Sequence, residues 1–139
     1  MMVSTRGRYA LRVMIDLAET GNGGPVAMKT IAERQDISLK YLERILPVLV
    51  KNNLVEGMQG KGGGYWLTRN PEEYKVGEIL RLTEGSLAPV SCLDCEKDAC
   101  GRAGTCRTRP MWEELNGIID EYFDRITLAD LMKDKEDAG

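Results

Sequence analysis

The segment KTIAERQDISLKYLERILPVLVKN, residues 29–52, carries the clearest indication of the fold of this chain. Residues 29–35 have the pattern of a short helix, and Ser38 is a good cap because its hydroxyl can accept from an unpaired amide of the next turn. We expect a second helix over 39–52 that buries Leu39, Leu42, Ile45, Leu46 and Leu49. A short helix, a tight turn and a longer helix with a polar outer face predict a helix-turn-helix.

The sequence on either side of this segment extends the prediction. Downstream, residues 54–58 and 65–68 are strand-like and enclose the glycine-rich run QGKGGG, residues 59–64. This pattern predicts a β-hairpin, which after a helix-turn-helix forms the wing of a winged helix. Upstream, we expect a helix that is capped by Thr5 and runs through Glu19 with a broad apolar stripe.

The second half of the chain contains one long apolar helix. We expect a helix over 76–84, a long helix from Pro110, and a last short helix over 128–132 capped by Thr127. The apolar set of the long helix is Trp112, Leu115, Ile118, Ile119, Tyr122, Phe123 and Ile126. A stripe of this length should pair with another helix, either the first helix of the chain or a symmetry mate.

The predicted fold is therefore mostly α with a small β-hairpin, an N-terminal winged helix-turn-helix followed by a long C-terminal helix. We divide the chain into a winged helix-turn-helix over 1–84 and a Cys-rich sensor loop over 85–109. The long helix and the short C-terminal helix take 110–132, and a charged, frayed tail takes 133–139.

The charge of the chain is unevenly distributed. All 139 residues together carry a formal net charge of −3. Residues 1–69 hold ten basic and six acidic side chains, a net charge of +4, whereas residues 70–139 hold nine basic and sixteen acidic ones, a net charge of −7. A basic half joined to an acidic half suggests that the first half meets a polyanion.

The residue types that are missing exclude several functions. There is no His, which removes the commonest general base and leaves no Ser-His-Asp or Cys-His site, so we do not expect an enzyme. No apolar run is long enough to cross a membrane, and the N-terminal segment is amphipathic. We therefore expect a cytoplasmic protein with reduced thiols and no membrane partner.

Four cysteines form the main chemical motif. Cys92, Cys95, Cys100 and Cys106 have the spacing Cys-x2-Cys-x4-Cys-x5-Cys. Thiols clustered in this way in a cytosolic chain indicate metal or redox chemistry. An iron–sulfur cluster tolerates such spacing, whereas structural zinc sites favour two Cys-x2-Cys pairs. Zinc and metal-free thiols or a disulfide remain the alternatives.

Several motifs together resemble one protein family. They are STRGRYA at 4–10, ISLKYLE at 37–43, KNNLV at 51–55, GKGGGY at 60–65, VGEI at 76–79 and ITLADL at 126–131. These motifs resemble the bacterial winged-helix transcriptional regulator family of IscR, NsrR and CymR. The resemblance implies a homodimeric transcription factor, usually a repressor, that binds partly palindromic double-stranded DNA and dimerises through the long helix.

In the cluster-binding branch of that family, three cysteines before the long helix hold an iron–sulfur cluster. Cys100 and Cys106 match the last two by position, and the first matches Cys92 or Cys95. One subgroup has a His where Arg109 stands, and another uses an acidic ligand where Arg8 stands. The extra cysteine is the natural substitute for these fourth ligands. The resemblance thus implies a [2Fe–2S] or [4Fe–4S] cofactor, with zinc as the alternative.

The resemblance also places the DNA contacts. We expect Ser38, Lys40, Tyr41, Glu43 and Arg44 to face the major groove. Lys40 and Arg44 would contact phosphates or guanine edges, while Tyr41 and Glu43 would shape base choice. Arg6, Arg8 and Lys61 would contact the backbone, and the wing would approach the minor groove through Gly60 and through Gln59, where the family commonly has Arg.

The predicted function is a DNA-binding transcriptional regulator, a repressor, that senses iron–sulfur cluster or redox status through its Cys-rich loop. It would control genes of iron–sulfur biogenesis or sulfur metabolism. One alternative is a metal-free regulator of the cysteine-metabolism type, which responds through thiol oxidation or a sulfur-metabolism partner enzyme. The other is a zinc or iron–sulfur protein that does not bind DNA.

Overall fold

The computed structural model describes residues 3–20, 24–90, 93 and 106–132. Its helices are α1 (Thr5–Thr20), α2 (Met28–Gln35), α3 (Leu39–Lys51), α4 (Val76–Glu84), α5 (Arg109–Arg125) and α6 (Leu128–Leu131). Strands β1 (Val55–Met58) and β2 (Gly64–Leu67) form an antiparallel hairpin, and a short 3₁₀ helix, η1, spans Pro71–Glu73. The expected fold, mostly α with a small hairpin, is confirmed. Within the described ranges, no helix has the length and apolarity to span a membrane.

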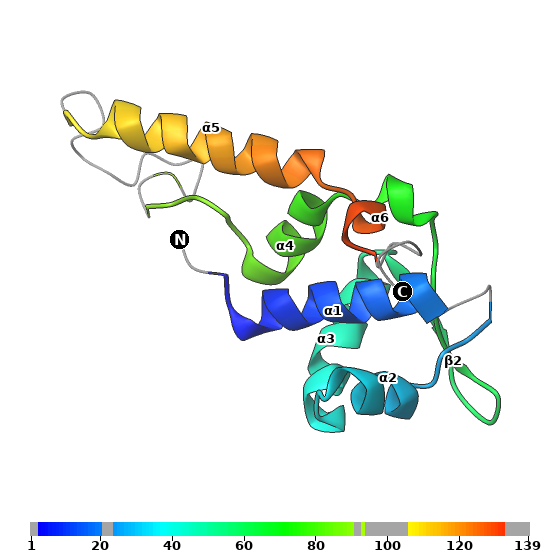
Figure 1. Cartoon of the computed structure of the whole chain (residues 1–139). Coiled ribbons are helices and arrows are strands. Elements are labelled where there is room, and N and C mark those ends of the chain that lie inside the picture. The colour runs from blue at the N-terminus through cyan, green and yellow to red at the C-terminus, as the bar shows by residue number, and fades with distance from the viewer. Residues whose placement is uncertain (1–2, 21–23, 91–92, 94–105, 133–139) are drawn as a thin grey trace.

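Helix α1 lies at the centre of the molecule, between α4 and the pair α2 and α3 (Figure 1). Its buried face carries Ala10, Val13, Met14 and Leu17. The first turn is capped by Ser4, whose Oγ accepts from the amide of Gly7 at 3.4 Å, and not by Thr5 as expected. Thr5 is instead the first helical residue, so the sequence prediction placed the cap one residue too late.

Helix α3 follows the predicted pattern with one exception. The Ser38 cap is confirmed, because its Oγ accepts from the Tyr41 amide at 3.1 Å. Leu42, Ile45, Leu46 and Leu49 are buried, but Leu39 is 45% exposed and its predicted place in the core is wrong. Ile37 and Leu42 fill the core on either side of the first turn, and Leu39 lies on the outward side between them.

The hairpin is joined to the rest of the fold by a backbone bridge. Val26 and Tyr65 exchange amide-to-carbonyl hydrogen bonds of 2.9 Å in both directions. This close approach requires a glycine at position 64, because a Cβ there would lie 2.6 Å from the Val26 backbone. Gly60 and Gly62 have φ angles of +100° and +83°, which turn the tip of the hairpin.

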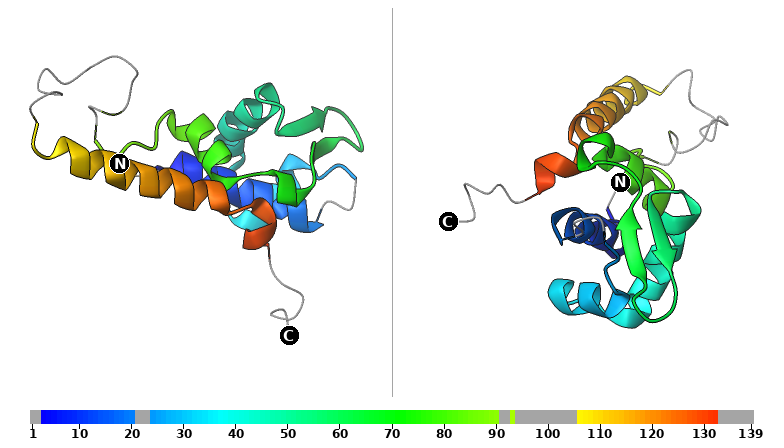
Figure 2. Two further views of the ribbon diagram at one scale, coloured as in Figure 1. Left: turned by 90° about the horizontal axis from the view of Figure 1, so that it is seen from above. Right: turned by 90° about the vertical axis from the view of Figure 1, so that its right-hand side faces the viewer.

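Helix α5 packs on α4 and extends away from the rest of the molecule (Figures 1 and 2). Ile119, Phe123 and Ile126 pack against a small second core formed by Val76, Leu80 and Leu87. Of the two partners that the sequence leaves open for the long helix, the first helix is not its neighbour within the chain, because α4 lies between α1 and α5. An adjoining side of α5 exposes Met111, Leu115, Ile118 and Tyr122, with exposed fractions from 37% to 57%.

An ion-pair network also joins α4 to α5. Arg81 donates through Nη1 to Asp124 Oδ1 at 2.8 Å and through Nη2 to Asp120 Oδ1 at 2.9 Å. The hydrogen bond from Arg81 lowers the pKa of Asp124, and the two carboxylates raise the pKa of Arg81. Gly77 leaves room for this network, because a Cβ there would lie 2.2 Å from Asp124 Oδ1.

Candidate nucleic-acid interface

The helix-turn-helix and the wing lie on the same side of α1, and α5 lies on the other side. In Figure 1 the α2–α3 pair and the hairpin tip occupy the lower part of the molecule and α5 the upper part. The end-on view in Figure 2 shows the same separation. The structure thus provides one surface that combines a helix-turn-helix with a wing, opposite the helix with the exposed apolar face.

Four of the predicted α3 residues lie on the outward surface. Ser38, Lys40, Glu43 and Arg44 are exposed, at the N-terminal end of the helix. A shallow pocket of about 240 Å³ is lined by Ser38, Lys40, Tyr41 and Arg44. Two cations beside the capped helix end make this surface suited to a phosphate backbone or a guanine edge.

Tyr41 differs from its neighbours because it is half-buried. Its ring packs edge-on against Tyr9 of α1, with 5.1 Å between the ring centroids and 70° between the ring planes. The guanidinium of Arg12 lies 5.2 Å from the Tyr9 ring centroid. Tyr41 therefore helps to hold the first turn of α3 on α1, in addition to any contact it makes outward.

The remaining predicted residues lie on α1 and on the wing. Arg6 and Arg8 are exposed in the first turns of α1, close in sequence to Tyr9, and Arg8 Nη2 donates to Thr5 Oγ1 at 3.1 Å. Gln59, Gly60 and Lys61 are exposed at the tip of the hairpin. The wing lies in the same half of the molecule as α3 (Figure 1), whereas Arg6 and Arg8 belong to the central helix α1, and the contacts of all these residues with DNA stay predictions.

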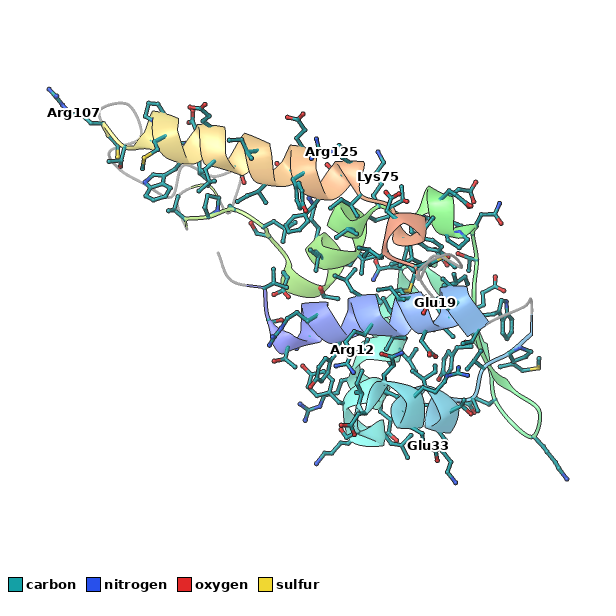
Figure 3. The ribbon with its side chains drawn as sticks, in the orientation of Figure 1. Arg12, Glu19, Glu33, Lys75, Arg107 and Arg125 are labelled. Atoms are coloured by element: carbon teal, nitrogen blue, oxygen red, sulfur yellow. The ribbon has the colours of Figure 1, made fainter. Side chains whose placement is uncertain are left out.

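A buried polar network under the helix-turn-helix was missed by the sequence analysis. Asp16 is 3% exposed and accepts from Arg34 Nε at 3.0 Å, from Arg34 Nη2 at 2.9 Å and from Gln35 Nε2 at 3.2 Å. Arg12, on the side of α1 toward α2 (Figure 3), donates to the Gln35 carbonyl at the end of α2. The sequence feature that points to this network is an acidic residue at position 16 within the apolar stripe of the first helix.

This network fixes α2 against α1 immediately before the turn into α3. The turn contains Asp36 in the left-handed region, with φ of 53°, and Ile37 anchored in the core. Because both ends of the turn are held, the N-terminal turn of α3 has a defined position relative to α1.

The cysteine motif lies mostly outside the described residues. This applies to Cys92, Cys95 and Cys100. Cys106 is half-buried just before α5, and its Sγ lies 3.3 Å from Thr108 Oγ1. The residues that the structure describes contain no group of three or more metal-ligating side chains, so the proposed ligand set rests on the sequence.

Comparisons with known proteins all identify transcriptional regulators as the relatives of this chain. Residues 3–134 match the Rrf2 family model, described as an iron-dependent transcriptional regulator. The chain is 40% identical over 134 residues to the protein rrf2 of Nitratidesulfovibrio vulgaris strain Hildenborough, which covers 96% of this chain and 89% of that protein.

Solved structures agree with this match. The global cysteine regulator CymR of B. subtilis has a TM-score of 0.77 at 35% identity, covering 94% of this chain and 95% of that one. The IscR of T. potens has a TM-score of 0.76 at 40% identity, covering 100% of this chain and 89% of that one. The structural similarity thus extends over both the winged helix-turn-helix and the long helix α5.

Proposed function

The chain belongs to the Rrf2 family of transcriptional regulators, and we propose that it is a cytoplasmic homodimeric repressor whose DNA binding responds to a cysteine-held cluster. Its place in the family makes it a DNA-binding regulator and not an enzyme. The dimer, the operator and the signal are the parts that we propose. A partly palindromic operator follows from a two-fold dimer, because each α3 helix would read one half-site.

The exposed face of α5 carries the dimer proposal. Met111, Leu115, Ile118 and Tyr122 follow each other at spacings of four, three and four residues and form one stripe along the helix. Four large apolar side chains in a row are unusual on a free surface and typical of a helix–helix interface. Pairing α5 with its symmetry mate would cover the stripe and leave both α3 helices accessible.

The sequence places the sensor in the loop that leads into α5. Cys92, Cys95, Cys100 and Cys106 would supply four thiolates, a ligand set that suits an iron–sulfur cluster and also zinc. Cys106 fits this role because it is half-buried directly before the first turn of α5, where the Trp112 amide donates to the Thr108 carbonyl at 3.2 Å. A bound iron–sulfur cluster would supply redox and oxygen sensitivity at this point.

The DNA-binding part is tested by titrating the purified chain into a pool of partly palindromic duplexes at several salt concentrations. We expect specific binding that weakens steeply with salt, because phosphate contacts release counterions. Arg44→Ala should weaken binding by about 1–3 kcal/mol. The matched control is Lys75→Ala, since Lys75 lies on the upper side with α5 (Figure 3). Salt-independent or undetectable binding would contradict the proposal.

The sensing part is tested by anaerobic purification. A brown protein with visible absorption, iron and sulfide, lost in Cys106→Ser, supports the cluster. A colourless protein that holds one zinc ion per chain and cannot be reconstituted with iron and sulfide would contradict it. If Cys→Ser variants keep regulated DNA binding, the signal is instead read by a partner enzyme of sulfur metabolism or by another part of the chain.

A further inference from the structure

Leu39 is an exposed apolar side chain on the outward surface at the N-terminal end of α3. It is the first residue of α3 and is 45% exposed, next to the exposed side chains of Ser38 and Lys40. The other residues at this end of the helix that face outward are polar or charged. A single exposed Leu is unremarkable on most surfaces, but here it stands at the helix position from which a helix-turn-helix reads base edges.

The structure keeps Leu39 outward. Ile37 and Leu42, which flank it, are 4% and 0% exposed and occupy the core. The Ser38 cap and the edge-on contact between Tyr41 and Tyr9 fix the first turn of α3 between these two anchors. Leu39 therefore cannot turn into the core without breaking this turn, and it presents a fixed apolar group to whatever binds the surface.

The charges around Leu39 decide the kind of partner. Lys40 and Arg44 line a pocket with Ser38 and Tyr41, and together with the exposed Glu43 they leave a net positive charge at this end of α3, which favours a polyanionic partner over an apolar protein surface. On the major-groove edges of the base pairs, the one apolar group is the C5 methyl of thymine. We propose that Leu39 packs against a thymine methyl group and selects for thymine at one position of each half-site.

This inference rests on the proposed DNA binding through α3, and its test separates the two. The full-length chain is first used to select duplexes from a random pool. Each thymine of one selected half-site is then replaced in turn by deoxyuridine, which removes only the methyl group. Dissociation constants are measured by fluorescence anisotropy at fixed salt for the wild type, for Leu39→Ala and for Leu131→Ala. Leu131, 40% exposed on α6, is the matched control.

The wild type should lose about fourfold in affinity at one thymine position, the factor expected from one buried methyl group. Leu39→Ala should bind thymine and deoxyuridine equally at that position, and Leu131→Ala should keep the wild-type ratio. If deoxyuridine has no effect at any position, or if its effect persists in Leu39→Ala, the inference is overturned while DNA binding stands. If no duplex is selected, the proposed DNA binding fails and this inference fails with it.

Discussion

At the scale of single residues, the position of the helix-turn-helix depends on a buried carboxylate, that of Asp16. Asp16 is 3% exposed and receives three hydrogen bonds from Arg34 and Gln35. A buried carboxylate without partners would be strongly destabilising, and here every donor comes from the end of α2. Asp16 therefore holds α2 in place rather than contacting DNA.

Replacing Asp16 with Asn should test this role. The amide keeps the shape but loses the ion pair with Arg34, whose side chain is 38% exposed and can return to water. We expect Asp16→Asn to lower the free energy of unfolding by about 1–3 kcal/mol in urea denaturation. Glu33→Gln makes the same change on the outer side of α2 (Figure 3) and should shift the free energy by less than about 0.5 kcal/mol. Equal losses of unfolding free energy in both variants would contradict the proposal that Asp16 holds α2 in place.

Some residues could be assigned from the sequence and others could not. Ser38 was predicted as a cap because capping depends on local chain geometry. Leu39 was assigned to the core because its spacing fits the helical pattern, but a pattern does not show where the core ends. The role of Asp16 does not follow from local sequence, because its partners lie eighteen and nineteen residues away.

At the scale of elements, α5 carries two sets of apolar side chains, one packed against α4 and one exposed. Ile119 and Phe123 pack on the small core of α4, and the stripe of Met111, Leu115, Ile118 and Tyr122 is exposed. Helical spacing predicts one continuous apolar set, because it cannot distinguish a face buried within the chain from a face buried between chains. The bounds of α4 were predicted correctly as 76–84, because Gly85 ends the helix with a φ of +83°.

A charge introduced into the exposed stripe should separate the proposed dimer. Ile118→Lys would place two ammonium groups near the two-fold axis of an α5–α5 interface, where like charges repel and lose water. We expect sedimentation velocity to show the mass of one chain at micromolar concentration.

The matched variant is Glu121→Lys, which adds a lysine to an exposed position of α5 outside the stripe. It should keep the mass of two chains. A wild type that sediments as a single chain, or an Ile118→Lys variant that stays dimeric, would contradict the proposed interface.

The stability that the Arg81–Asp124 ion pair gives to the contact between α4 and α5 should depend on pH. Arg81 holds the pKa of Asp124 below its ordinary value, so this pair stabilises the fold above the unfolded pKa of about 3.9 and is lost as the pH falls through the lower folded pKa. Because Asp124 is 40% exposed, its contribution should stay within about 1 kcal/mol.

Urea denaturation of the wild type and of Asp124→Asn at several pH values tests this contact. The two proteins should differ at pH 7, and the difference should shrink below pH 4. Glu121→Gln, on the exposed surface of the same helix, serves as the control and should track the wild type. A difference between the wild type and Asp124→Asn that is independent of pH would exclude the ion pair as its cause.

At the scale of the whole molecule, the uneven charge of the sequence coincides with the division of the fold. Residues 1–69, with a net charge of +4, contain α1 to α3 and the wing. Residues 70–139, with a net charge of −7, contain α4, α5 and α6, and α5 lies on the side away from α2 and α3 (Figure 1). In a dimer joined through α5, both basic halves would remain available to DNA.

We propose that a cluster held before α5 controls DNA binding. The direct measurement is operator affinity under anaerobic conditions for three samples: the cluster-loaded protein, the same protein after removal of the cluster, and Cys106→Ser. We expect the loaded protein to differ in affinity or in preferred operator from the other two, which should agree with each other. Identical affinity and identical operator preference in all three samples would contradict control of DNA binding by the cluster.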